Sequence, residues 1–108
     1  MGWLTMEEVK WKSNGQLTTY SPSTYKIPAV NDMPQKFYTK IFKQGKNIEN
    51  VVNKSKTTGE PPLMLAMSVF FAIKDAISSI SNYKISPELD APATAEKILL
   101  AINKITEN

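Results

Sequence analysis

Residues 55–80, SKTTGEPPLMLAMSVFFAIKDAISSI, contain the strongest structural signal of the sequence. A polar loop ends at Glu60, and two prolines and the longest apolar run of the sequence follow it. Proline suits the first positions of a helix, where no amide hydrogen is missed. Apolar residues then recur at helical spacing, and two methionines and two phenylalanines make the first half apolar nearly all round. This pattern predicts a long helix, beginning near Pro62 and buried on most sides.

Short strands are predicted upstream of this stretch. Residues 9–12 alternate between apolar and charged, residues 13–15 (Ser-Asn-Gly) favour a turn, and residues 16–20 return as the second strand of an antiparallel hairpin. Residues 35–43 fit either a helix or a strand, and their aromatic and β-branched content favours a third strand. The spacing Thr5-x-x-Glu8 predicts a capping box on a single helical turn over residues 5–9.

The remaining segments predict a connection and a second helix. Residues 21–34 contain three prolines and should form a long extended connection, in which Tyr25 and Ile27 are interpreted as packing anchors rather than ligands. Thr94 should cap an amphipathic C-terminal helix with Glu96 in its first turn. The fold class predicted is α+β, in three parts: strands and connection (1–53), polar loop and buried helix (54–82), connection and amphipathic helix (83–108).

Composition excludes several kinds of chemistry. The 108 residues contain no cysteine and no histidine, which leaves no disulfide, no Cys/His zinc site, no thiolate iron–sulfur cluster and no histidine base. The net charge is +3, and every basic residue is lysine. A solvated lysine-rich face is therefore favoured over a nucleic-acid interface, for which arginine would be expected. No signal-peptide pattern is visible, and the apolar run 61–73 is short for a membrane span, so we expect a cytoplasmic protein without membrane contact.

Glu60 is the candidate for acid–base chemistry. Because a proline follows it, its backbone is expected outside the α region, with its carboxylate beside a helix N-terminus that favours the ionised form. Gly59 before it permits a close approach or an unusual φ angle. On spacing alone, an acidic helix cap is favoured over a general base.

A resemblance to a known family extends over nearly the whole chain. The segments GWLTMEE (2–8), STYKIP (23–28), SKTTGEPPL (55–63), SVFFAIKDAI (68–77) and PATAEKI (92–98) resemble, in the same order, the C-terminal part of the molybdenum-binding domain of xanthine dehydrogenases and aldehyde oxidases. The resemblance implies an oxidoreductase with the molybdenum cofactor, molybdopterin. It further implies that Glu60 is the active-site base in the oxidative hydroxylation of a purine such as hypoxanthine or xanthine, or, alternatively, of an aldehyde.

The same resemblance implies what surrounds Glu60 in a complete enzyme. Gly59, Lys56 and Thr58 become candidate cofactor contacts, and no metal ligand is assigned. FAD and 2Fe-2S clusters belong to the parent enzyme and not to this chain. The partners expected are the remainder of that enzyme, which is expected to be a homodimer, and a small-molecule substrate, but no nucleic acid.

Much of the family's active site has no counterpart here. We therefore expect the chain to be a fragment, with Met1 a truncation point or a gene-model start, and inactive when isolated. In isolation the long helix should expose Met64, Met67, Phe70 or Phe71, which the rest of the enzyme would otherwise cover. An alternative of another class is a non-catalytic remnant or a small interaction module.

Overall fold

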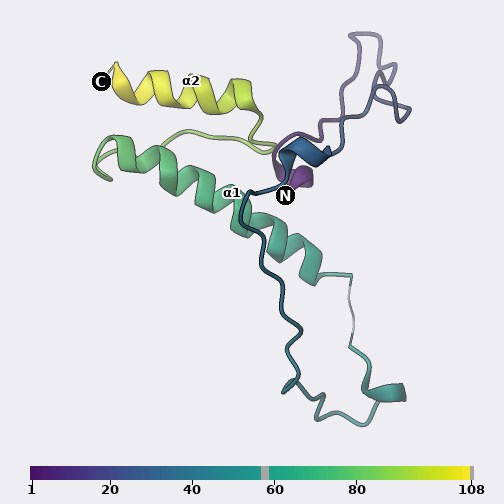
Figure 1. Ribbon diagram of the computed structural model, residues 1–108. Helices are drawn as coiled ribbons and strands as arrows, with labels where there is room; N and C mark the ends of the chain where they lie inside the picture. Colours follow the sequence, from purple (N-terminus) through teal and green to yellow (C-terminus); the bar gives the residue numbers. More distant parts are fainter. Residues whose placement is uncertain (57–58, 108) are drawn as a thin grey trace.

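A computed structural model describes residues 1–56 and 59–107. It contains three short 3-10 helices and two α-helices: η1 (Gly2–Leu4), η2 (Val30–Asp32), η3 (Val52–Lys54), α1 (Pro61–Ile80) and α2 (Ala95–Thr106). The connection after α1 returns alongside that helix, so α1 and α2 both run from the middle of the view toward its left in Figure 1. Between η2 and α1 the chain leaves this body as a long extended excursion.

Both helices begin where the sequence predicts. α1 carries prolines at its first two positions. At the start of α2, the Thr94 hydroxyl oxygen accepts a hydrogen bond of 3.4 Å from the backbone N–H of Lys97. The prolines and the threonine cap are sufficient to predict these positions, because the start of a helix is specified by residues within its first turn.

The core lies between the C-terminal halves of these helices. Ile77 of α1 packs with Ala101 and Ile105 of α2, and these three residues are 3 to 7% exposed. Partly buried apolar side chains surround them: Ile73, Ile85, Leu89, Ile98 and Ile102. The two helices therefore join through one small apolar cluster rather than an extensive interior.

Within this chain α1 is not buried on most sides, and its first half is exposed as expected for an isolated fragment. In its first half Met64 is 61% exposed and Leu65 is 68% exposed, while Ala66 is buried. α1 is also 20 residues long and contains an 18-residue window with a mean hydropathy of 1.7, so by length and composition alone it could cross a membrane. The apolar run 61–73 considered in the sequence is shorter than this helix. The helices of soluble protein cores satisfy the same criterion.

The predicted hairpin and third strand are both wrong: no strand occurs among residues 1–56 and 59–107. The turn itself forms, with Gly15 at φ +81° and the N–H of Lys12 donating to the carbonyl of Gln16 at 2.9 Å. On either side of this turn, the described residues form a single antiparallel bridge, between Trp11 and Leu17, instead of two paired strands. A two-stranded ribbon is marginal unless a further strand or an apolar face supports it, and this segment has neither.

Residues 35–43 are neither strand nor helix, and all of them are exposed. Their aromatic and β-branched side chains suit a pleated surface, but no neighbouring strand lies beside them to accept backbone hydrogen bonds. The short helical turn is also displaced, because it forms at Gly2–Leu4 rather than over residues 5–9. The Thr5 hydroxyl donates to the carbonyl of Met1 at 3.1 Å, so it satisfies the end of that turn instead of capping a later one.

Candidate functional site

Glu60 lies where the extended excursion ends and α1 begins. Its φ and ψ are −84° and −38°, in the α region, so the expectation that proline would hold it outside that region is wrong. The steric preference before proline is outweighed because the Glu60 carbonyl accepts a hydrogen bond of 3.0 Å from the N–H of Leu63. The side chain makes no capping hydrogen bond, and the residue is exposed. Its carboxylate is therefore not occupied in holding the helix end.

The other candidate site residues lie on the approach to Glu60. Gly59 is exposed, and a methyl group added to it would meet no described atom within 4 Å. Its φ lies outside the left-handed region, so the chain alone does not require glycine there. Lys56 is exposed, and Thr58 lies outside the described residues. Lys56 and Gly59 are therefore solvent-exposed residues that precede the Glu60 carboxylate in the chain.

The hollows of the surface lie elsewhere. A hollow of about 430 Å³ opens between the N-terminal segment and the start of α2, with Met6, Ile73 and Ile98 among its lining residues. A second, of about 260 Å³, lies against α2 beside Glu88 and Lys104. Neither includes Glu60, and no group of three or more potential metal-ligating residues occurs in the described part of the chain. The described residues around Glu60 therefore form at most one side of a binding site.

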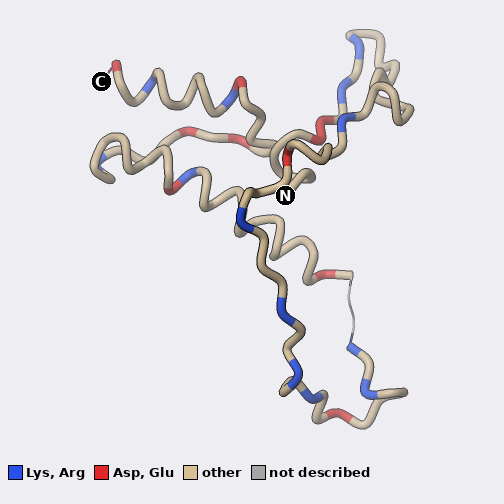
Figure 2. The backbone as a smooth tube through the Cα atoms, in the orientation of Figure 1, with Lys and Arg blue, Asp and Glu red and all other residues tan. Residues whose placement is uncertain are grey.

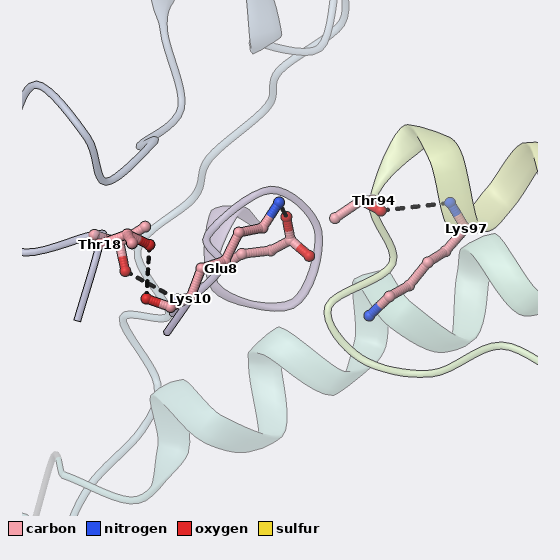
Figure 3. Close-up of polar contacts among 6 residues, drawn as sticks. Glu8, Lys10, Thr18, Thr94 and Lys97 are labelled. Carbon is pink, nitrogen blue, oxygen red and sulfur yellow. Dashed lines mark hydrogen bonds and ion pairs between the residues drawn. The ribbon is translucent and has the colours of Figure 1, made fainter. Parts of the chain in front are cut away.

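Polar contacts that the sequence did not indicate fix the N-terminal segment. The carboxylate of Glu8 pairs with the ammonium of Lys10 at 2.9 Å, and the hydroxyl of Thr18 donates to the Lys10 carbonyl at 2.8 Å (Figure 3). The hydrogen bond to Glu8 raises the pKa of Lys10. The N–H of Ala93 donates to the carbonyl of Leu4 at 2.7 Å. The last of these contacts spans almost the whole sequence, which no local pattern could have revealed.

The N-terminal third of the chain also matches a family model. Residues 1–34 match the molybdopterin cofactor-binding domain. Xanthine dehydrogenase/oxidase of Mus musculus is 46% identical over 104 residues, which cover 91% of this chain. Xanthine dehydrogenases of Oryza sativa subsp. japonica and Dictyostelium discoideum are 41% and 43% identical over 99% and 91% of the chain. Over most of its length, the chain is similar to one segment of the xanthine dehydrogenases.

This similarity confirms the resemblance of the sequence to part of the molybdenum-binding domain of xanthine dehydrogenases. The chain spans only 7 to 8% of the length of these xanthine dehydrogenase relatives. It therefore corresponds to a small segment of a much longer enzyme. The domain model ends at residue 34, so the role of Glu60 and the division of the chain into three parts stay predictions.

Proposed function

We propose that this segment, within a complete enzyme of the xanthine dehydrogenase family, supplies Glu60 as the general base in hydroxylation of a purine such as hypoxanthine or xanthine. The observation that carries the proposal is the exposed Glu60 carboxylate, which makes no capping bond at the start of α1. A base must present a free carboxylate oxygen to the proton that it accepts. The relatives reported above are named for xanthine, which favours a purine over an aldehyde.

The chemistry divides between the cofactor and the chain. The molybdenum cofactor, when bound, supplies the redox chemistry of the hydroxylation. Glu60 accepts the proton that is released when an oxygen atom attacks the substrate. Pro61 and Pro62 restrict the backbone that follows, so the carboxylate is attached to a rigid helix start.

The residues around Glu60 fit one side of a cofactor site. Gly59 leaves space for a close approach, since a Cβ there would meet no described atom within 4 Å. Lys56 carries a positive charge that can pair with the phosphate of molybdopterin. We assign the rest of the cofactor pocket, the FAD and 2Fe-2S sites, and the homodimer interface to the parent enzyme, which we place in the cytoplasm. The isolated chain is then inactive, because its base has no cofactor to act with.

The test is a chimera in which this chain replaces the matching segment of the mouse relative. Glu60→Gln should lower the kcat for xanthine by about a hundredfold to ten-thousandfold, the usual contribution of a general base. Molybdenum content should not change, since Gln keeps the size of the side chain. Glu107→Gln is the matched control, because Glu107 is exposed and lies at the end of α2, outside the excursion on which lysines gather in Figure 2. Retained turnover in the Glu60→Gln chimera would remove the residue from the role of base.

A further inference from the structure

The position of Glu60 depends on the position of α1. Glu60 has a helical backbone conformation, and its carbonyl accepts the hydrogen bond of 3.0 Å from the N–H of Leu63. Pro61 and Pro62 follow it and restrict the backbone. The side chain makes no capping hydrogen bond that could fix the carboxylate at the helix start. A movement of α1 therefore moves the carboxylate with it.

The core contact of α1 lies far from Glu60. Ile77 packs against Ala101 and Ile105, and it lies about 26 Å along the helix from Glu60 at about 1.5 Å per residue. At that distance a tilt of about 2° displaces the helix start by about 1 Å. A misplacement of about 1 Å can cost about a hundredfold in rate. The core contact by itself is therefore a weak restraint on the carboxylate.

A second buried residue of α1 lies much closer to Glu60. Ala66 is 5% exposed, and it lies about 9 Å along the helix from Glu60. At about 100° of rotation per residue, Ile73 and Ile77 lie within about 20° of Ala66 around the helix axis. Leu65 beside it is 68% exposed, so the covered side of α1 is narrow. One side of the helix thus faces the body from Ala66 to Ile77.

The N-terminal turn lies against the same side of α1. Within the described chain α1 contacts two other helices, α2 and η1, and Figure 1 shows η1 next to α1 and close to the connection into α2. Ile73 lines the same hollow as Met6 and Ala93, so this side of the helix faces the N-terminal segment. Since α2 packs at Ile77, η1 is the helix available to cover Ala66.

Two contacts fix η1 in turn. The carbonyl of Leu4 accepts a hydrogen bond of 2.7 Å from the N–H of Ala93, which is 2% exposed and directly precedes the Thr94 cap of α2. Gly2 is buried, and a Cβ on it would lie 2.4 Å from Cγ of Pro28. A shift of η1 would therefore break this hydrogen bond or bring η1 into the proline ring.

We propose that Ala66 is a positioning residue for the proposed hydroxylation: packed on η1, its methyl group sets the separation between α1 and the N-terminal turn and thereby places the Glu60 carboxylate. The inference rests on the proposed function, because it takes Glu60 as the base. With a contact about 9 Å away, a tilt of about 6° is needed to move Glu60 by about 1 Å. The nearer contact is thus the tighter restraint. Because packed interiors hold little free space, a larger side chain at this position must push α1 away from η1.

The test uses the complete chimera with the mouse relative. Ala66→Leu should lower the kcat for xanthine about tenfold to a hundredfold, with little change of KM, because the displaced base is needed in the chemical step. Ala66→Ser, which is close to alanine in size, should keep the kcat of the parent chimera. Ile105→Ala is the control, since it removes packing from the distant core contact without pushing α1 away from η1. It should lower the melting temperature and leave kcat unchanged.

A double-mutant comparison separates positioning from a general loss of stability. In the Glu60→Gln background, Ala66→Leu should lower the remaining kcat by less than about twofold, because the group that it displaces is already absent. A change that merely weakens the fold would lower kcat by the same factor in both backgrounds. Molybdenum content is measured in every variant, so that loss of turnover is not loss of cofactor.

Gly2→Ala approaches the same contact from η1, and it carries the test if Ala66→Leu fails to retain molybdenum. The added methyl group displaces η1, because the ring of Pro28 cannot rotate away. We expect kcat to fall with little change of KM, and again far less in the Glu60→Gln background than in the parent.

Three results would overturn the positioning role. They are an unchanged kcat in a variant that retains molybdenum, equal losses of kcat with and without Glu60→Gln, and a loss in Ile105→Ala as large as that in Ala66→Leu. Each of them leaves the base in place if Glu60→Gln alone abolishes most of the turnover. Turnover that survives Glu60→Gln would instead refute the proposed function, and the positioning of its base with it.

Discussion

The hydroxyl of Tyr25 donates a hydrogen bond of 2.8 Å to Oε2 of Glu7, and so ties the extended connection to the N-terminal segment. This hydrogen bond to a carboxylate, followed by burial and the charge of Glu7, raises the pKa of Tyr25. The same contact holds Glu7 beside Gly2 and Pro28. Two segments that are separate in the sequence are thus fixed at one point.

The first prediction concerns the alkaline titration of Tyr25. Since its folded pKa is above the unfolded value, the bond stabilises the chain fully below the unfolded pKa, and this contribution is lost as the pH rises through the folded pKa. Glu7→Gln should lower the pKa of Tyr25 toward the ordinary tyrosine value. Tyrosinate absorbance measures this, with Tyr25→Phe identifying the signal. Identical titration curves for Glu7→Gln and the parent chain would contradict the assignment.

The second prediction contrasts two glycines. A Cβ on Gly2 would lie 2.4 Å from both Oε1 of Glu7 and Cγ of Pro28, and the proline ring cannot rotate away. Gly2→Ala should therefore destabilise the N-terminal segment by about 1 to 3 kcal/mol, as overpacking does. Gly59→Ala is the control, because a Cβ there meets no described atom within 4 Å. Denaturant unfolding followed by tryptophan fluorescence compares them, and equal stabilities would show that the N-terminal contact is not formed.

The third prediction addresses the core. Ile77 is 3% exposed and packs against Ala101 and Ile105. Ile77→Ala should cost about 2 to 5 kcal/mol, through lost burial and the cavity left behind. Leu99→Ala removes a side chain that is 57% exposed, so it should change stability by about 0.5 kcal/mol or less. Thermal unfolding followed by circular dichroism distinguishes them, and equal shifts would place the helix contact elsewhere.

The fourth prediction concerns the ion pair between the carboxylate of Glu88 and the ammonium of Lys104. The hydrogen bond from Lys104 and its positive charge lower the pKa of Glu88. The stabilisation is thus present above the unfolded pKa of the carboxyl group and is lost as the pH falls through its folded pKa. Both side chains are largely exposed, so the effect on stability should be small and reduced by salt.

Lys104→Met should bring the pKa of Glu88 back up toward its ordinary value. Titration of the Glu88 carboxyl by NMR measures the change, with Lys97→Met as a control on the same helix. A Glu88 titration that is unaffected by Lys104→Met would mean that another group lowers its pKa.

Local sequence signals predicted the helices well and the strands badly. Each helix start depends on residues within one turn of it: Pro61 and Pro62 for α1, and the hydroxyl of Thr94 for α2. These signals act without contacts from distant segments. The patterns at 9–20 and 35–43 describe side chains suited to a sheet, but a strand needs hydrogen bonds from a neighbouring segment. Ile27, expected as a packing anchor, is 64% exposed, so the described part of the chain does not bury it.

The sequence by itself determined the helix starts, the family resemblance and the candidacy of Glu60, since each depends on residues adjacent in the chain or on their order along it. Only the tertiary structure decided which surfaces are covered. It showed that the Glu60 carboxylate is free of the helix end, that the N-terminal turn is held by Ala93, and that the first half of α1 is exposed. Whether a side chain is buried depends on the segments that pack around it. An apolar sequence makes burial favourable, but it does not determine which segments cover it.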